Sequence, residues 1–228
     1  MSQQVFMSWS GGKDCCLALY RAIKSGMDVK YLANTVRENG TRSCSHGISS
    51  AVIKAQAKAL GMPIVQQPTL NDNYEEQFVK MIKKFKGEGI EGGVFGDIDF
   101  NAHREWIENA CTKADITPYL PLWLEDQTKL MEEFIDAGFE SVVVAAKAEL
   151  FGMDVLGRKI DRDFIKYLEG MSEKQEITPC GEAGEYHTLV IDGPIFKQRL
   201  EITNSEKVQR DGYIYLEICD TELKSKKQ

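Results

Sequence analysis

The segment SWSGGKDCC near the N-terminus holds residues that together could bind an anion. Gly11 and Gly12 let backbone N–H groups approach a ligand closely, because neither carries a Cβ atom. Ser10 adds a hydroxyl donor and Lys13 a full positive charge. A helix that begins here would direct about half a positive charge at the same point. The spacing is not the Walker pattern GxxxxGK[ST], but the chemistry suits the pyrophosphate of a nucleotide.

Two other interpretations of this segment stay open from the sequence. Asp14 is a residue type that stabilises the start of a helix, so the segment could be only a tight turn with a cap. Cys15 would lie at a helix N-terminus near Lys13, where a thiolate is stabilised. The same cysteine also follows the period of a packed first turn, which favours a small buried side chain over a reactive thiol.

A second group of chemically capable side chains lies in GEAGEYHT, where Glu182, Glu185 and His187 fall within six positions. Gly181 and Gly184 let the backbone turn sharply, so several polar side chains can point into one cleft. Two carboxylates could hold an ammonium, a magnesium ion or a cationic substrate, and a neutral imidazole could accept a proton. The alternative is a surface turn that carries charges, but a strongly apolar strand follows directly.

His46, in SCSHG, could reach a substrate carboxylate or a phosphate, or it could be an ordinary loop histidine. Together with Cys44, Cys180 and His187 it could in principle bind zinc. The spacing contains neither CxxC nor HxxxH, so we expect no metal held by the protein alone.

The first half of the chain alternates between strand-like and helix-like segments. Short apolar runs predict strands at residues 5–9, 29–36, 63–67, 92–98 and 118–123, and helical periods predict helices at residues 14–26, 49–60, 74–85 and 100–114. This alternation predicts a Rossmann-like parallel sheet covered by helices on both faces. Ligands of such sheets bind at the carboxyl ends of strands, and SGGKD falls at that end of the first strand.

Other candidates follow the same edge of the expected sheet. Gly96, Asp97 and Arg104 follow the fourth strand, which would place them beside the nucleotide. They could equally supply a helix cap and a surface ion pair. Val36 lies at the end of the second strand, where related folds often cradle adenine through the backbone.

The pattern changes after Trp123. A helix at residues 126–137 and a β-branched strand at residues 139–147 precede a loop-rich stretch and a short helix that ends near Leu168. HTLVIDGPIF, KQRLEITN and DGYIYLEICD then predict antiparallel strands with turns at 192–193 and 211–212. We therefore expect an α/β domain at residues 1–124 and a smaller α+β domain at residues 125–228.

Composition limits the class of function. The chain has 228 residues, 43% of them hydrophobic and 28% charged, which is typical of a soluble globular protein. A net charge of −7 argues against broad binding to nucleic acid. No apolar run approaches the roughly 18 residues that a membrane helix needs, and no secretory signal is evident. Six scattered cysteines without a CxxC pair fit reduced thiols in a cytoplasm.

SGGKD after a short apolar strand resembles the PP-loop, S-G-G-x-D-S/T, of N-type ATP pyrophosphatases, which cleave ATP between the α and β phosphates. Cys15 stands where that pattern has Ser or Thr. GEAGEYHT resembles the GExGE-[FY]-HT signature of the diphthine–ammonia ligase (diphthamide synthetase) family. Further segments agree in order along the chain, namely TRSCSHGISS, QAKALGMPIV, GDIDFNAHREWIENAC, LPLW, LMEEFIDAGFESVVV and LGRKID.

The resemblance implies a two-domain amidating enzyme with ATP and Mg²⁺ as cofactors. ATP would activate a carboxylate as an acyl-adenylate with release of pyrophosphate, and ammonia would then displace AMP. The carboxylate would be diphthine, a modified histidine of a translation elongation factor, or a related acid. The resemblance also admits a homodimer.

Matching motifs carry the family's site residues onto this chain. The pyrophosphate-binding set would be Ser10, Gly11, Gly12, Lys13 and Asp14. The reaction centre would contain Glu182, Glu185 and His187, with Glu185 binding ammonia or accepting a proton.

Two rival functions share the PP-loop. One is sulfur transfer, suggested by Cys180 next to the GE pair. Such enzymes generally need a second working cysteine and a basic RNA-binding face, and neither is evident. The other is a regulatory protein that holds a nucleotide without turnover, which the exchange at Cys15 makes a real alternative.

Overall fold

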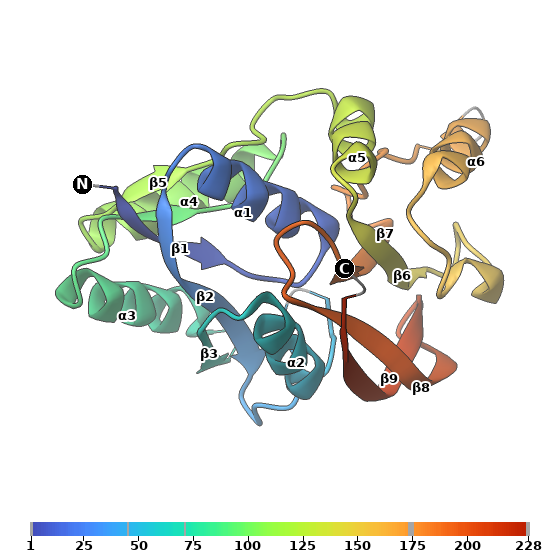
Figure 1. The fold of residues 1–228 in the computed structure, drawn as a ribbon, viewed down its shortest axis with the longest axis horizontal. Helices are drawn as coiled ribbons and strands as arrows, with labels where there is room; N and C mark the ends of the chain where they lie inside the picture. Colours follow the sequence, from blue (N-terminus) through green and yellow to red (C-terminus); the bar gives the residue numbers. More distant parts are fainter. Residues whose placement is uncertain (1, 45, 71, 173–175, 227–228) are drawn as a thin grey trace.

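The computed structural model describes residues 2–44, 46–70, 72–172 and 176–226. Its first half is a parallel sheet in the order β3-β2-β1-β4-β5 (Figure 1). The strands are β1 (Gln4–Ser8), β2 (Asp28–Arg37), β3 (Ile64–Thr69), β4 (Gly92–Val94) and β5 (Thr117–Tyr119). The helices between them are α1 (Lys13–Lys24), α2 (Ser50–Leu60), α3 (Tyr74–Gly87) and α4 (Asn101–Lys113). The predicted Rossmann-like architecture is confirmed.

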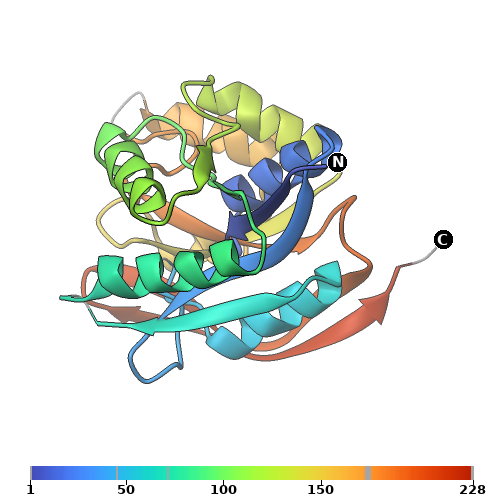
Figure 2. The same ribbon diagram turned by 90° about the vertical axis from the view of Figure 1, so that its left-hand side faces the viewer.

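Alternate residues of β1 point to opposite faces of this sheet and enter two separate cores. Val5 and Met7 pack with residues of α1 and α2. Phe6 instead belongs to a cluster that contains the aromatic rings of α3 and buried aliphatic residues of α4. Figure 2 shows the two helix layers on either side of the strands. Burial of the strand on both faces explains why its three central residues, Val5 to Met7, are all apolar.

The second half forms an antiparallel sheet in the order β7-β6-β9-β8, with two helices packed beside it (Figure 1). Its elements are α5 (Gln127–Asp136), β6 (Glu140–Lys147), a 3₁₀ turn η1 (Met153–Val155), α6 (Arg162–Ser172), β7 (Tyr186–Asp192), β8 (Gln198–Arg210) and β9 (Tyr213–Ser225). The tight turn between β8 and β9 has positive φ at Asp211 and Gly212, as the sequence predicts. Within the described ranges, no helix is both long and apolar enough to cross a bilayer.

Two strands of the parallel sheet are shorter than predicted. β4 ends at Val94, although the apolar pattern continues to Ile98. The chain leaves the sheet there because Gly96 lies against the first turn of α1, where a Cβ atom would fall 2.7 Å from the Cys15 nitrogen. β5 likewise ends at Tyr119, and residues 121–124 form a turn.

A buried amide joins three segments that position the PP-loop. Gln56, on α2, is 0% exposed. Its Nε2 donates to the Gly11 carbonyl at 2.9 Å and to the Val190 carbonyl at 2.7 Å, and its Oε1 accepts from the Trp9 indole at 3.0 Å. All of its hydrogen-bonding groups are therefore used to hold the loop between α2 and β7.

We predict that Gln56→Leu lowers the free energy of unfolding by about 3 kcal/mol, because buried polar groups that lose a partner cost roughly 1–3 kcal/mol each. Urea unfolding at pH 7 measures the change. Gln67→Leu is the matched control, since that amide is half-exposed and its partners among the described residues are only Gln77 and the neighbouring Pro68. Equal loss in the two variants would contradict the junction role of Gln56.

Candidate active site

The SGGKD loop connects β1 to α1 and requires glycine at both glycine positions. Gly11 has a φ of 86°, and a Cβ atom there would lie 2.7 Å from the Ile53 side chain. A Cβ atom on Gly12 would lie 2.6 Å from the His46 imidazole. The loop therefore holds a backbone path that other residues could not follow, and it leaves the first-turn N–H groups of α1 without intrahelical partners.

Lys13 is covered by the segment that contains the GEAGEYHT motif, and only 3% of its surface is exposed. Its ammonium bonds the Asp14 carboxylate at 2.9 Å, donates to the Cys180 carbonyl, and lies 5.2 Å from the centre of the Tyr186 ring. Burial alone would lower the pKa of Lys13, but the charge of Asp14 and the other neighbours outweigh it and raise the pKa. Lys13 is thus a buried, paired cation.

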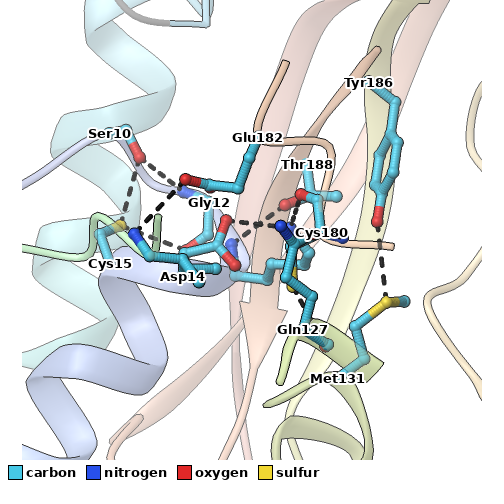
Figure 3. Close-up of polar contacts among 12 residues, drawn as sticks. Ser10, Gly12, Asp14, Cys15, Gln127, Met131, Cys180, Glu182, Tyr186 and Thr188 are labelled. Atoms are coloured by element: carbon cyan, nitrogen blue, oxygen red, sulfur yellow. Dashed lines mark hydrogen bonds and ion pairs between the residues drawn. The ribbon is translucent and has the colours of Figure 1, made fainter. Parts of the chain in front are cut away.

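Strand β7 is docked directly onto the PP-loop (Figure 3). The Lys13 N–H donates to the Thr188 hydroxyl at 3.0 Å, and the Val190 N–H donates to the Gly11 carbonyl at 3.0 Å. The two motifs that the sequence separates by about 170 positions are therefore one site.

Glu182 lies between the GEAGEYHT segment, to which it belongs, and the segment that follows β4. Its own N–H donates to the Thr178 hydroxyl at 2.8 Å, and its Oε2 accepts weakly from the Ile98 N–H at 3.4 Å. Burial, followed by the charges of Asp14 and Asp97, raises the pKa of Glu182 to about 7. This carboxyl can therefore take up or release a proton near neutral pH.

Glu185 is buried, with 1% of its surface exposed. Its Oε1 accepts from the Thr178 N–H at 2.6 Å. Its Oε2 is also buried and has no hydrogen-bond partner among the described residues. Because a buried carboxylate oxygen without a donor is costly, this atom offers a place for a small donor or cation.

His187 and His46 form a stacked pair beside these carboxylates, with ring centres 4.5 Å apart and an angle of 22° between the planes. Burial, with a smaller contribution from the charge of Lys13, lowers the pKa of His187 to about 4. Burial also holds the pKa of His46 well below its usual value. Both imidazoles are therefore neutral at pH 7 and can act as hydrogen-bond acceptors.

The residues after β4 divide into two groups. Gly96 and Asp97 lie at the PP-loop, where burial raises the pKa of Asp14 and Glu182 and the charge of Asp97 adds a smaller increase to both. Asp97 does not cap α4; it lies 3.2 Å from His103. Arg104 forms an ion pair with Glu108 at 2.6 Å, which is the surface alternative that the sequence left open.

Val36 occupies the end of β2, where it was expected, and is 2% exposed. Its carbonyl accepts from the Thr69 hydroxyl at 3.3 Å. The structure therefore places this backbone at the carboxyl edge of the sheet, and its part in adenine binding stays a prediction.

The buried thiols near the site are protonated. Burial raises the pKa of Cys15 to about 11, and its Sγ contacts the Ser10 hydroxyl at 3.3 Å and the Gly12 carbonyl at 3.2 Å. Burial also raises the pKa of Cys180, whose Sγ donates to the Gln127 carbonyl at 3.3 Å. Both cysteines therefore serve as packed, hydrogen-bonded groups.

Three polar residues of the site were not singled out from the sequence: Gln56, Thr188 and Gln127. Gln127 accepts from the Cys180 N–H at 2.8 Å and donates to Asp99 at 2.7 Å, so it ties the C-terminal loop to the segment after β4. Thr188 lies inside the GEAGEYHT signature and Gln56 at the start of QAKALGMPIV. Their positions in those segments were the only available signals, because each acts on residues far away in the chain.

Comparison with known proteins identifies the family. A family model described as the diphthamide synthase N-terminal domain matches residues 3–118, and one described as the diphthamide synthase C-terminal domain matches residues 126–222. A diphthine–ammonia ligase of Danio rerio is 28% identical over 229 residues, covering 87% of this chain and 86% of the relative.

Two further relatives carry the same name. The protein of Rattus norvegicus is 29% identical over 224 residues, covering 87% of this chain and 82% of the relative. The protein of Schizosaccharomyces pombe is 28% identical over 235 residues and covers 95% of this chain, which spans only 38% of that longer relative. The chain therefore belongs to the diphthamide synthase family of ATP-dependent, amide-forming ligases.

Proposed function

We propose that this protein uses ATP to convert a carboxylate into an amide with ammonia, and that diphthine on an elongation factor is the first substrate to test. The names of its relatives supply the substrate and the ammonia. The observation that carries the proposal is the contact between the two motifs through Lys13 and Thr188. A triphosphate held at the start of α1 would then lie beside Glu182, Glu185 and His187.

The nucleotide seat in this proposal is the loop from Ser10 to Asp14. First-turn amides and the helix dipole favour the β and γ phosphates there. In this proposal the adenosine would lie along the carboxyl edge of the sheet, where Gly96 and Val36 are found. These positions support ATP binding by residues that the sequence already suggests.

The reaction proposed has two displacements. A substrate carboxylate oxygen attacks the α-phosphorus of ATP, and the bond to the β-phosphate breaks to release pyrophosphate. The nitrogen of ammonia then attacks the acyl carbon of the adenylate and AMP leaves with the electron pair of the broken C–O bond. Adenylation is needed because a carboxylate is a poor electrophile and its oxygen a poor leaving group.

Three side chains are proposed to bind the ammonia nitrogen and to remove its proton. The free Oε2 of Glu185 accepts a hydrogen bond from ammonium or ammonia. Glu182, with a pKa of about 7, takes the proton that the nitrogen loses. The neutral imidazole of His187 would accept a further hydrogen bond, and His46, stacked on its ring beside Gly12, is the residue proposed to contact the substrate.

Mg²⁺ fits this site only together with phosphate oxygens. Among the described residues, no three His, Cys, Asp or Glu side chains gather closely enough to hold a metal ion. Mg²⁺ commonly uses one or two carboxylates plus substrate phosphates, and Asp14 and Asp97 are the carboxylates available here. The ion would neutralise negative charge on the phosphates.

The rival functions fit less well. Sulfur transfer needs a reactive thiolate, whereas burial raises the pKa of Cys180 and its Sγ is bonded to Gln127. A regulatory protein would bind ATP without releasing pyrophosphate under any substrate. We further propose that the protein works in the cytoplasm, and its oligomeric state is part of the experiment described below.

We predict that Glu185→Gln lowers amide formation by about 100-fold or more, because the amide removes the negative charge that holds the ammonium. Nucleotide affinity should stay within about twofold of wild type. The assay follows amide, AMP and pyrophosphate with diphthine-bearing elongation factor, ATP and ammonium. Glu169→Gln, an exposed change on α6, is the matched control. Normal amidation by the Glu185 variant would contradict this role.

We predict that the rate of amide formation falls as the pH drops below about 7, because Glu182 must be ionised to accept a proton. The profile is measured at a constant concentration of free ammonia, so that ionisation of the nucleophile does not mimic the effect. Glu182→Gln should remove this limb and lower the rate by about 100-fold. An unchanged inflection in the variant would assign it to another group.

A further inference from the structure

Two large apolar side chains are exposed at one place beside the candidate active site. Phe100 is 52% exposed and Leu124 is 71% exposed. The Leu124 N–H donates to the Ile98 carbonyl at 2.7 Å, so the segments that carry them are held side by side. We call Phe100, His103, Arg104, Trp123 and Leu124 the 100/124 patch.

The patch has the composition of an interface anchor. The Phe100 and His103 rings are 4.7 Å apart at their centres, and the Arg104 guanidinium lies 5.1 Å from the centre of the Trp123 ring. Trp, Tyr and Arg are the side chains most enriched where proteins bind one another tightly. An exposed apolar group with such neighbours is typical of a contact surface.

Leu124 is also held in an unusual backbone conformation, with a φ of 57°. The other non-glycine residues with positive φ among those described are Asp115 and Asp211, a residue type that tolerates this region. A leucine kept in a strained conformation with most of its side chain in water contributes little to the fold. Such strain concentrates at functional sites.

The patch is continuous with the reaction loop. The Ile98 N–H, two residues before Phe100, donates to Glu182 at 3.4 Å. Asp99 bonds Gln127 at 2.7 Å, and Gln127 in turn accepts from the Cys180 N–H at 2.8 Å. A molecule bound on the patch would therefore lie next to the carboxylates proposed to handle ammonia.

The rim of the patch is acidic. Asp99, Glu105 and Asp126 are exposed around it, and none of the three forms an ion pair with a lysine or arginine of the described residues. Glu125 differs, because Arg21 pairs with it. Asp99 accepts a hydrogen bond from Gln127 and Asp126 caps α5, so their negative charges are hydrogen-bonded but not neutralised by a cation. Carboxylates around an apolar anchor whose charge is not neutralised favour a partner of opposite charge.

We infer that the 100/124 patch binds a basic segment with an apolar anchor side chain on the protein that carries the substrate carboxylate. This inference rests on the proposed function, in which the acid belongs to a protein. Binding there would hold the partner while its modified residue reaches the loop directly before β7, which carries Glu182 and Glu185. Glu182 and Glu185 would then meet the carboxylate only when the correct protein is docked.

The test measures binding of diphthine-bearing elongation factor to the full chain by biolayer interferometry, and amide formation in parallel. Leu124→Gly and Phe100→Ser should each raise Kd about tenfold, the effect of one interface anchor. Glycine suits a φ of 57°, so the Leu124 variant keeps its thermal midpoint. Ile23→Ser, which removes a 40% exposed apolar side chain from the far end of α1, should leave Kd unchanged.

The acidic rim adds a second expectation, namely that raising the salt concentration weakens binding of the wild-type protein. No binding by the wild-type protein, or equal Kd values for wild type and both patch variants, would overturn the docking surface. If the wild-type protein binds but forms no amide, and the patch variants bind more weakly, the docking surface stands and the proposed reaction fails. Size-exclusion chromatography of the same samples shows whether the binding unit is a monomer or a homodimer.

Discussion

The buried ammonium of Lys13 is the interaction on which the candidate site depends. A charge removed from water is costly unless it is paired and its donors are satisfied. Asp14 and the Cys180 carbonyl supply those partners, and the face of Tyr186 closes the remaining side. Because one partner lies on the same helix and two belong to the C-terminal half, satisfying Lys13 requires the loop before β7 to sit on the PP-loop. The same charge then lowers the pKa of His187.

The hydrophobic core makes the same connection on a larger scale. One cluster of buried residues contains Val5 and Met7 of β1 together with Leu189 and Val190 of β7. The face of the parallel sheet that carries α1 and α2 is therefore packed against the antiparallel sheet, whereas the face that carries α3 and α4 has a core of its own. Hydrophobic packing brings the two halves together, and the hydrogen bonds of Gln56 and Thr188 fix their register.

The sequence was sufficient for local features and insufficient for long-range ones. Hydrophobic period and glycine stops, such as Gly61 with a φ of 71° after α2, predicted the helices of the first half to within a few residues. The last two strands were predicted too short, because β8 continues to Arg210 and β9 to Ser225. The predicted end of the fourth strand was wrong, because a contact with α1, which is distant in the sequence, draws Gly96 out of the sheet. The surface position of Arg104 and the burial of Glu185 also depend on tertiary packing, which periodicity cannot encode.

The clearest chemical consequence of this packing is that the pKa of Glu182 lies above the pKa of His187. In water an imidazole holds a proton more strongly than a carboxylate, but here the pKa of Glu182 is about 7 and that of His187 about 4. Burial moves both values, since it disfavours the anion of one group and the cation of the other. The neighbouring charges partly offset one another. Asp14 and Asp97 raise the pKa of Glu182 while Lys13 lowers it. Lys13 likewise lowers the pKa of His187 while Glu185 raises it. Between these two pH values both groups are neutral, whereas above a pH of about 7 the carboxylate of Glu182 is ionised and the imidazole of His187 is still neutral. A site that removes a proton from nitrogen needs an ionised carboxylate and a neutral imidazole at once, and the pKa of Glu182 sets the pH above which both are present.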